Sequence, residues 1–364
     1  MTATPVWNAQ DEPNKVAEAA ALLQAGEVVA FPTETVYGLG ADAGSDEAVA
    51  KIFAAKGRPS DNPLIVHLAS REQLPQVVAG EPGAIEQALM AAFWPGPLTL
   101  VLPARQDALS PRVTAGLTTV AVRVPDHPLA LALLRACGRP LAAPSANRSG
   151  RPSPTTAAHV ALDLDGRVAA ILDGGPTGVG LESTVVQVVS EPTPAVHILR
   201  PGGVTAQHIR EVISSDVNII IADQHVEAES TPRAPGMKYA HYAPKGDLTV
   251  VSGDSPEQVA TWIAQQPTDV DERLGILTYE EHLHFYEPLL QNSETPLTIV
   301  TCGSWHDPAS VARNLYAALR QFDELGATRI FAEAYPAQDG GLGQAVMNRL
   351  VKAAGNSIVE LANN

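Results

Sequence analysis

Six short polar strings carry most of the side chains that could do chemistry in this chain of 364 residues. Lysine and arginine bind phosphate or carboxylate oxygens, and small hydroxyl and amide groups line a nucleotide pocket without steric bulk. The sequence has no GxxxxGK[ST] loop, HExxH helix, GxSxG elbow or CxxC pair, so covalent catalysis by a protein nucleophile has little support. The strings are PTETVYGLGADA (32–43), KGRPSDNPL (56–64), VRVP (122–125), PSANRSG (144–150), LESTVV (181–186) and RPGG (200–203).

The string that starts at Lys56 predicts a stiff cationic loop. Lys56 and Arg58 lie on either side of Gly57, and Pro59 and Pro63 restrict the backbone that follows. Such a loop can bind phosphate oxygens through the point charge of lysine and the planar fork of arginine. The plainer alternative is a pair of cations that complement the dipole at the end of a helix.

Two other strings place small polar groups after short strands. Residues 32–43 put hydroxyls, a carboxylate and a phenol beside two glycines, in a segment that also reads as an ordinary threonine-rich turn. Residues 144–155 combine Ser145 and Asn147 with two arginines, which suits an anion pocket and equally a surface loop. The strings that contain Ser183 and Arg200 are weak signals when each is taken alone.

Strict alternation over residues 119–125 (TVAVRVP) puts Thr119 and Arg123 on one face of a strand and the valines on the other. An arginine on the inner side of a strand needs an anion, whereas an exposed edge strand would remove that need. His67 lies within an apolar strand, where a histidine is more often a satisfied core residue than a ligand contact.

The elements that must position these groups alternate along the first two hundred residues. Apolar runs predict strands, and amphipathic stretches closed by Pro or Gly predict helices between some of them. Several connections are too short for crossover helices, so we expect a twisted mixed α/β sheet. The predicted strands are 28–31, 64–68, 98–102, 119–124, 168–172 and 184–189, and the predicted helices are 46–55, 83–93, 128–137 and 155–164.

A proline-rich segment without apolar periodicity divides the chain. Beyond it, strands at 248–251, 274–277, 297–301 and 330–334 alternate with helices at 256–265, 308–325 and 343–354, which predicts a smaller, Rossmann-like parallel α/β domain. The glycines at 340–343 lack the GxGxxG spacing and are interpreted as a turn. The predicted domains are 1–226 and 248–364, joined by a linker at 227–247.

Composition narrows the class of protein. The net charge is −16, with −5 in residues 1–212 and −11 in residues 213–364, which disfavours extended phosphate-backbone binding by the second half. No apolar run approaches a membrane span and the start lacks a signal-peptide pattern, so we expect a cytoplasmic protein with no membrane partner. Cys137 and Cys302 are too few for a disulfide framework or a zinc site and are expected to be reduced.

The six strings, in this order, resemble the YrdC-type threonylcarbamoyl-AMP synthase family. The linker sequence PGMKYAHYAP and the acidic tail resemble the long, two-domain form of that synthase. The resemblance implies a nucleotidyltransferase that converts L-threonine, bicarbonate (or carbon dioxide) and ATP to threonylcarbamoyl-AMP and pyrophosphate. The product is the activated donor that downstream threonylcarbamoyl-transfer machinery uses to modify tRNA. Mg²⁺ would share the charge of the triphosphate, and no metal-ligating residues are predicted in the chain.

The same resemblance implies roles for individual residues. Lys56 and Arg58 would be catalytic, and Lys238, Tyr239 and His241 would form a lid with Tyr242 across the pocket mouth. Threonine would be held by Thr35, His67, Arg123 and Ser183. ATP would be held by Arg58, Asn62, Thr119, Ser145, Asn147, Ser153, Arg200 and Tyr242, with Lys56 beside it.

Two other functions remain open at this point. A non-catalytic RNA-binding protein would use the arginines of residues 105–151, although the net charge of −16 argues against it and leaves direct tRNA binding uncertain. A carbamoyl-transfer domain of the hydrogenase-maturation type would share the fold, but it would need more cysteines for metal binding than the two present.

Overall fold

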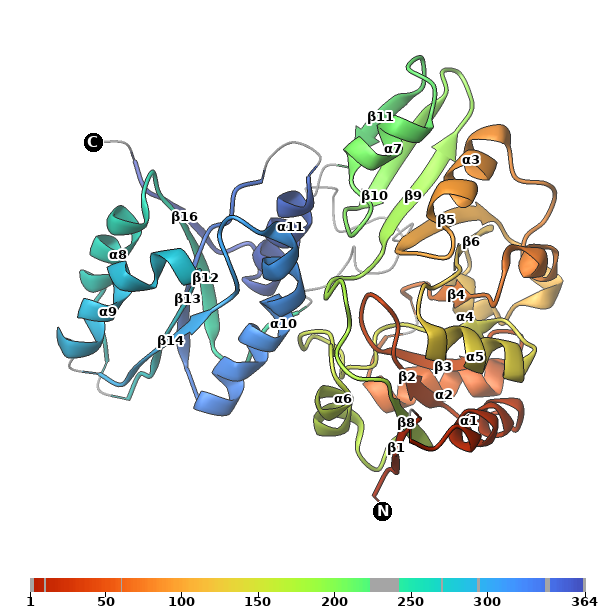
Figure 1. Ribbon diagram of the computed structural model, residues 1–364, viewed down its shortest axis with the longest axis horizontal. Coiled ribbons are helices and arrows are strands. Elements are labelled where there is room, and N and C mark those ends of the chain that lie inside the picture. Colours follow the sequence, from red (N-terminus) through yellow and green to blue (C-terminus); the bar gives the residue numbers. More distant parts are fainter. Residues whose placement is uncertain are drawn as a thin grey trace. The chain divides into compact units, whose positions relative to one another are not determined.

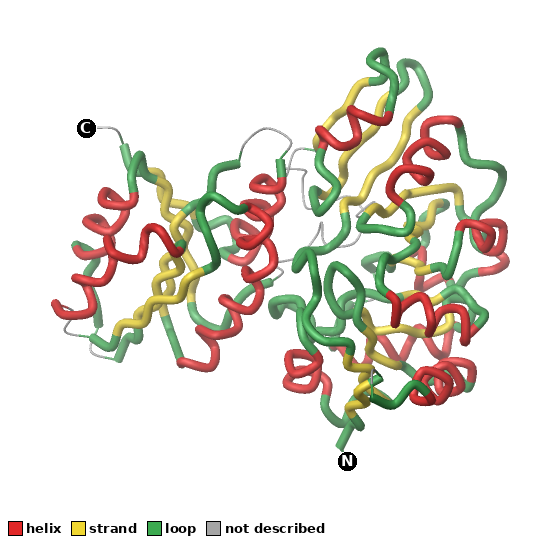
Figure 2. The backbone as a smooth tube through the Cα atoms, in the orientation of Figure 1, coloured by secondary structure: helices red, strands yellow, loops and turns green. Residues whose placement is uncertain are grey.

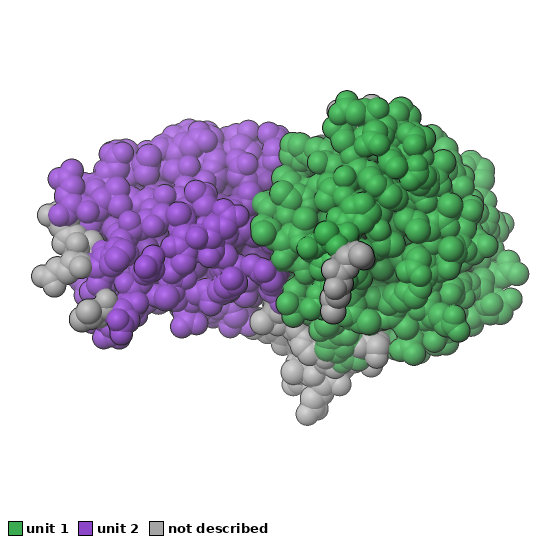
Figure 3. Space-filling view, turned by 90° about the horizontal axis from the view of Figure 1, so that it is seen from below, with its two compact units in different colours: residues 1–149, 153–239 green, residues 150–152, 240–364 purple. Residues whose placement is uncertain are grey.

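A computed structural model describes residues 3–9, 11–59, 61–222, 242–269, 271–292, 295–337 and 341–362. The chain forms two compact units, shown in separate colours in Figure 3. Unit 1 comprises residues 1–149 and 153–239, and unit 2 comprises residues 150–152 and 240–364. Most of the predicted linker, 227–247, falls outside the described residues, so the predicted domain limits remain a prediction.

Unit 1 is built on a sheet of eleven strands with the order β1-β8-β2-β3-β7-β4-β6-β5-β9-β10-β11 (Figure 1). Parallel pairs such as β4 with β6 and antiparallel pairs such as β2 with β3 occur in the same sheet. The predicted mixed sheet is therefore confirmed. The strands are β1 (Val6–Asn8), β2 (Val29–Phe31), β3 (Gly38–Asp42), β4 (Ile65–His67), β5 (Leu98–Pro103), β6 (Thr119–Arg123), β7 (Leu141–Ala142), β8 (Ala170–Asp173), β9 (Thr184–Val189), β10 (Ala195–Arg200) and β11 (Asn218–Ile221).

The helices of unit 1 have ends that the sequence specifies well. In α2 the Ser45 side chain accepts a hydrogen bond from the backbone N–H of Ala48, and Gly57 ends the helix in the left-handed conformation at φ 62°. This C-cap places Lys56 in the last helical turn, as the plainer interpretation of the cationic loop expected. The helices are α1 (Asn14–Gln24), α2 (Asp46–Lys56), α3 (Ala84–Phe93), α4 (Pro111–Thr114), α5 (Pro128–Cys137), α6 (Ala157–Leu164) and α7 (Ala206–Val212).

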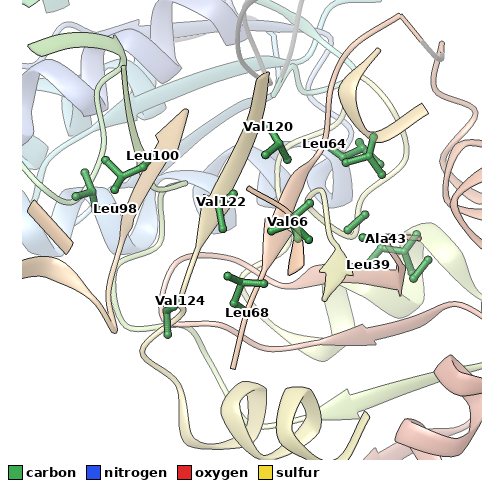
Figure 4. Packing of buried hydrophobic residues seen from close by; sticks show 14 of the residues in the cluster. Leu39, Ala43, Leu64, Val66, Leu68, Leu98, Leu100, Val120, Val122 and Val124 are labelled. Atoms are coloured by element: carbon green, nitrogen blue, oxygen red, sulfur yellow. The ribbon is translucent and has the colours of Figure 1, made fainter. Parts of the chain in front are cut away.

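The main core of unit 1 lies on one face of the central strands (Figure 4). Alternate residues of β4, β5 and β6 and their flanks point into it, because successive side chains of a strand face opposite sides. Those residues are Leu64, Val66, Leu68, Leu98, Leu100, Val120, Val122 and Val124. The residues between them face the other side, where Ile65, Val101, Ala121 and Val185 form a separate small apolar cluster.

The glycines at 38 and 40 correct one sequence interpretation. We expected them in a turn, but Gly38–Asp42 is strand β3, paired antiparallel with β2. A Cβ atom at Gly40 would lie 2.8 Å from Cε1 of Phe31, a fully buried ring on the neighbouring strand. The glycine is therefore required by the close approach of an aromatic ring rather than by a turn.

Unit 2 contains a five-stranded sheet with the order β14-β13-β15-β12-β16, and every pair is parallel. The parallel Rossmann-like prediction is confirmed, with β16 as an added strand. Figure 2 shows helices α8 and α9 on one side of the strands and α10 and α11 on the other. The strands are β12 (Asp247–Ser252), β13 (Leu274–Thr278), β14 (Leu297–Thr301), β15 (Arg329–Glu333) and β16 (Ile358–Glu360), and the helices are α8 (Pro256–Ala264), α9 (Leu283–Asn292), α10 (Pro308–Leu325) and α11 (Leu342–Ala353).

Gly341 and Gly343 also differ from their interpretation as part of a turn, while Gly340 lies outside the described residues. Gly341 is the N-cap of α11, and Gly343 lies inside the helix, where a Cβ would approach the carbonyl oxygen of Pro336 to 2.2 Å. Across the described parts of both units, no helix has the length and apolar character needed to cross a bilayer.

The contact between Gly40 and Phe31 predicts the effect of a single methyl group. Gly40→Ala should lower the free energy of unfolding by about 1–3 kcal/mol, because the buried ring must shift to admit the Cβ. Urea unfolding followed by circular dichroism measures the change. Gly178→Ala is the control, since its Cβ would meet nothing nearer than 3.9 Å, and equal transition midpoints for the two variants would contradict the explanation.

Candidate functional site

A row of polar side chains lies on the face of the unit 1 sheet that is opposite the main core. His67 and Arg123 are register partners on the parallel strands β4 and β6. Thr99 lies on β5, and its hydroxyl is 2.7 Å from the hydroxyl of Ser183, which directly precedes β9. All four residues are buried. Because β6 lies between β4 and β5, Arg123 is on an interior strand and the edge-strand alternative does not apply.

The Arg123 guanidinium is held by two adjacent residues of the first polar string. Its Nη1 donates to Oγ1 of Thr35 at 2.9 Å, and its Nη2 donates to Oε2 of Glu34 at 2.6 Å. The Arg123 side chain is 4% exposed and that of Glu34 is 12% exposed. Oε1 of Glu34 and Nε of Arg123 are also buried, and neither has a hydrogen-bond partner within the described part of the chain. Glu34 was not among the residues predicted to bind a ligand, although it lies next to Thr35, which was.

His67 is neutral in this environment. Burial, together with the positive charge of Arg123, lowers the pKa of the His67 imidazole from 6.5 to about 3. Its ring packs edge-on against Phe31, with the centroids 6.2 Å apart, and Nδ1 lies 3.3 Å from the carbonyl oxygen of Ile65. A neutral imidazole beside a guanidinium offers hydrogen bonding without adding a second positive charge.

A second cluster joins the cationic loop to the PSANRSG string. The ammonium of Lys56 donates to the carbonyl oxygens of Ser145 and Asn147, the latter at 2.6 Å. The Ser145 hydroxyl donates to Oδ1 of Asn147 at 2.5 Å. Lys56 is 3% exposed, so backbone oxygens rather than water stabilise its positive charge.

Backbone hydrogen bonds connect these strings to one another. The Ala146 N–H donates to the carbonyl of Tyr37 at 2.8 Å, and the Ser149 N–H donates to that of Lys56 at 2.9 Å. The Gly180 N–H donates to the carbonyl of Thr35 at 3.1 Å. Segments that are far apart in the sequence are therefore tied into one polar region of unit 1.

Arg58 and Asn62 lie at the other end of the cationic loop. Nη2 of Arg58 donates to the carbonyl oxygens of Asn62 and Pro63, at 3.3 and 3.4 Å. Asn62 is 1% exposed, yet in the described ranges neither its amide nitrogen nor its amide oxygen has a hydrogen-bond partner. Buried amides are almost always paired, so these two atoms are suited to the polar groups of a ligand.

Ser153 and Arg200, both predicted to hold ATP, are engaged by neighbouring residues. The Ser153 hydroxyl donates to Glu182 at 2.5 Å. Nε and Nη2 of Arg200 both donate to the carbonyl oxygen of Ser183, at 3.2 and 3.0 Å, and Nη2 also donates to its hydroxyl at 3.2 Å. These contacts orient Ser183. Glu182 lies within the LESTVV string and could have been proposed from the sequence. Thr99 lies in an apolar strand, where no motif indicates a polar role.

Gly202 lets the RPGG segment pack directly against the backbone of the LESTVV segment. A Cβ at this position would lie 2.4 Å from the carbonyl oxygen of Glu182 and 2.5 Å from the backbone nitrogen of Thr184. The Thr184 hydroxyl also donates to the carbonyl oxygen of Val204 at 2.6 Å. The two segments pack backbone against backbone, which only glycine permits at this point.

The remaining predicted residues lie elsewhere or outside the described chain. Thr119 begins β6 and is half-buried. Tyr242 belongs to unit 2, where its ring centroid is 5.2 Å from that of Tyr316. The proposed lid residues Lys238, Tyr239 and His241 are outside the described residues. Among the side chains that are described, no group of three or more His, Cys, Asp or Glu is arranged to hold a metal ion.

Two protein families match this chain, one in its first part and one in its second. A family described as "Telomere recombination" matches residues 21–202, and one described as "Threonylcarbamoyl-AMP synthase, C-terminal domain" matches residues 204–355. The threonylcarbamoyl-AMP synthase of Bacillus subtilis is 52% identical over 346 residues, which cover 95% of this chain and 94% of the relative. That of Pyrococcus abyssi is 44% identical over 353 residues, which cover 95% and 96%.

A solved structure agrees with these sequence matches. The crystal structure of P. abyssi Sua5 complexed with L-threonine has a TM-score of 0.84 and 41% sequence identity to this chain. The match covers 99% of this chain and all of the other.

The neutral state of His67 predicts a pH dependence of stability. Between pH 6.5 and about 3, the unfolded chain binds a proton at this histidine and the folded chain does not, so acidification should favour unfolding. His67→Gln should make the plot of unfolding free energy against pH shallower over this range, by up to about 1.4 kcal/mol per pH unit. The exposed His208→Gln variant is the control. The assignment fails if both variants keep the wild-type slope.

Proposed function

The chain belongs to the threonylcarbamoyl-AMP synthase family, and on that premise we propose how it makes L-threonylcarbamoyl-AMP from L-threonine, bicarbonate or carbon dioxide, and ATP. Members of the family use ATP as a substrate, and pyrophosphate would be the second product. The observation that carries the proposal is the buried polar group of Arg123, Thr35, His67 and Ser183 on the sheet of unit 1.

The threonine substrate would lie on the polar face of the sheet. Arg123 supplies the positive charge that a carboxylate requires, and it is already oriented by two hydrogen bonds. Neutral His67 and Ser183 would contact the remaining polar groups of the amino acid. A P. abyssi relative has been crystallised with L-threonine, which supports this choice of substrate.

ATP would be held by the second cluster. Lys56 and Arg58 would stabilise the charge that develops on the phosphates, and the unpaired amide of Asn62 would bind a nucleotide oxygen or ring nitrogen. Ser145 and Asn147 fix the position of the Lys56 ammonium. In this proposal Thr119, Ser153 and Arg200 would also hold ATP.

No protein nucleophile is needed for this chemistry. The amine of threonine would capture carbon dioxide, and the resulting carbamate oxygen would attack the α-phosphorus of ATP as the bond to pyrophosphate breaks. The enzyme would therefore act as a nucleotidyltransferase that positions its substrates and stabilises charge. Mg²⁺ would arrive bound to ATP, because phosphate oxygens are its usual ligands and the described residues offer no carboxylate cluster.

The proposal also includes a lid over the site and a recipient for the product. The segment with Lys238, Tyr239 and His241 would act as a lid that keeps water from the hydrolysable product. The product would pass, in the cytoplasm, to the machinery that modifies tRNA. Direct RNA binding as the main function is not favoured, because the chain carries a net charge of −16.

Omission of each substrate in turn tests the reaction. Pyrophosphate release from ATP should require both L-threonine and bicarbonate, and leaving out either should reduce the rate to background. A coupled pyrophosphate assay measures it, and mass spectrometry of the products identifies the adenylate. Release that continues without threonine would rule out the proposed function.

Arg58 provides the test of the ATP cluster. Arg58→Ala should lower the rate of pyrophosphate release by at least about a hundredfold, because it removes a preorganised positive charge from the reacting phosphates. Arg167→Ala changes an exposed arginine of the same unit and should keep the wild-type rate. Similar rates for the two variants would show that Arg58 does not take part.

A further inference from the structure

The buried ion pair between Glu34 and Arg123 has two unsatisfied atoms of opposite kind. Oε1 of Glu34 is a hydrogen-bond acceptor and Nε of Arg123 is a donor, and both are buried without a partner among the residues that the structure describes. The two side chains are joined through other atoms, Nη2 of Arg123 and Oε2 of Glu34, which are 2.6 Å apart. Buried polar atoms are rarely left unpaired, so two of them within one ion pair need an explanation.

The hydrogen bonds around Thr35 show which polar groups remain available to a ligand. The Thr33 hydroxyl donates to the carbonyl oxygen of Val36 at 2.7 Å, so the Thr35 hydroxyl must donate to Oγ1 of Thr33, 2.8 Å away. Thr35 is then left as the acceptor for Nη1 of Arg123. The threonines therefore fix the guanidinium, and their donors are already used. Glu34 Oε1 is the acceptor that stays unused beside the substrate-binding arginine.

An α-amino acid supplies the complement of both unpaired atoms. Its carboxylate accepts from Nε of a guanidinium, and its ammonium, one carbon away, donates to a carboxylate oxygen. We propose that Glu34 binds the ammonium of the amino acid substrate while Arg123 binds its carboxylate, so that the pair selects amino acids over hydroxy acids. The inference rests on the proposed function and assigns a specificity-determining role to Glu34.

The position of Glu34 fits this role. Its backbone carbonyl accepts a hydrogen bond from the Val179 N–H at 2.8 Å, which fixes the main chain. The Glu34 side chain as a whole is 12% exposed although Oε1 itself is buried, so the substrate would take the position of the atoms that now cover this oxygen. Among the described side chains, Glu34 provides the anion that is bonded to Arg123, and His67, being neutral there, cannot replace it.

Calorimetric titration without ATP tests the proposal with two probes. One is L-threonine, and the other is (2S,3R)-2,3-dihydroxybutanoate, in which a hydroxyl replaces the ammonium. The wild type should bind threonine at least a hundredfold more tightly than the hydroxy acid. Glu34→Gln should weaken threonine binding at least tenfold and change binding of the hydroxy acid less than threefold. Glu12→Gln, an exposed position of the same unit, should leave both affinities unchanged.

Each other outcome counts against the role of Glu34. If the Gln variant weakens both probes by the same factor, Glu34 only positions Arg123 and the proposal is wrong. Unchanged threonine affinity in that variant also overturns it. Failure of the wild type to bind threonine at all would instead overturn the proposed function.

The wild type alone gives a second test should the Gln variant not fold, which circular dichroism would reveal. A threonine preference below threefold in the wild type would exclude an ammonium-binding carboxylate. Glu34→Asp, which keeps the charge, should retain a preference of at least tenfold.

Discussion

Three cations buried in unit 1 require oxygen acceptors, and this requirement determines how the polar strings come together. Lys56, Arg123 and Arg200 are each less than 5% exposed. Removing such charges from water costs several kcal/mol per ion unless hydrogen bonds compensate. For Lys56 and Arg123 the acceptors come from segments 88 to 91 residues away in the sequence. The polar site and the fold therefore stabilise one another, because the strings that bind these cations also contain or flank strands of the sheet.

The fold was predictable where the sequence shows a clear period or a clear stop. Helix α10 was predicted with its observed limits, 308–325, because it has a strong apolar face and is closed by Gly326. Strand β3 was missed, because its glycines indicated a turn and the Phe31 ring that requires Gly40 is visible only in three dimensions. Strands β10 and β11 pair through register that no local pattern specifies.

The candidate site was predictable as a set of strings but not as a set of contacts. Alternation in TVAVRVP correctly assigned Arg123 to the face opposite the valines, because strand geometry fixes that relation locally. No sequence pattern could show that Glu34 would neutralise Arg123, or that Ser153 would donate to Glu182. Thr99 was missed for a related reason, since a threonine in an apolar strand gives no signal until its partner Ser183 is placed beside it.

The charges around Arg123 explain how such a site can favour a zwitterionic substrate. A protonated His67 would add a second positive charge beside the guanidinium, and both burial and Arg123 itself oppose that protonation. Glu34 leaves the immediate surroundings close to neutral, so a ligand with a net negative charge gains less there than one that carries both signs. The cationic Lys56 and Arg58 lie in the other cluster, where triphosphate charge would be bound. If the substrates bind as proposed, separating a near-neutral region from a cationic one would direct the amino acid and the nucleotide to different positions by charge alone.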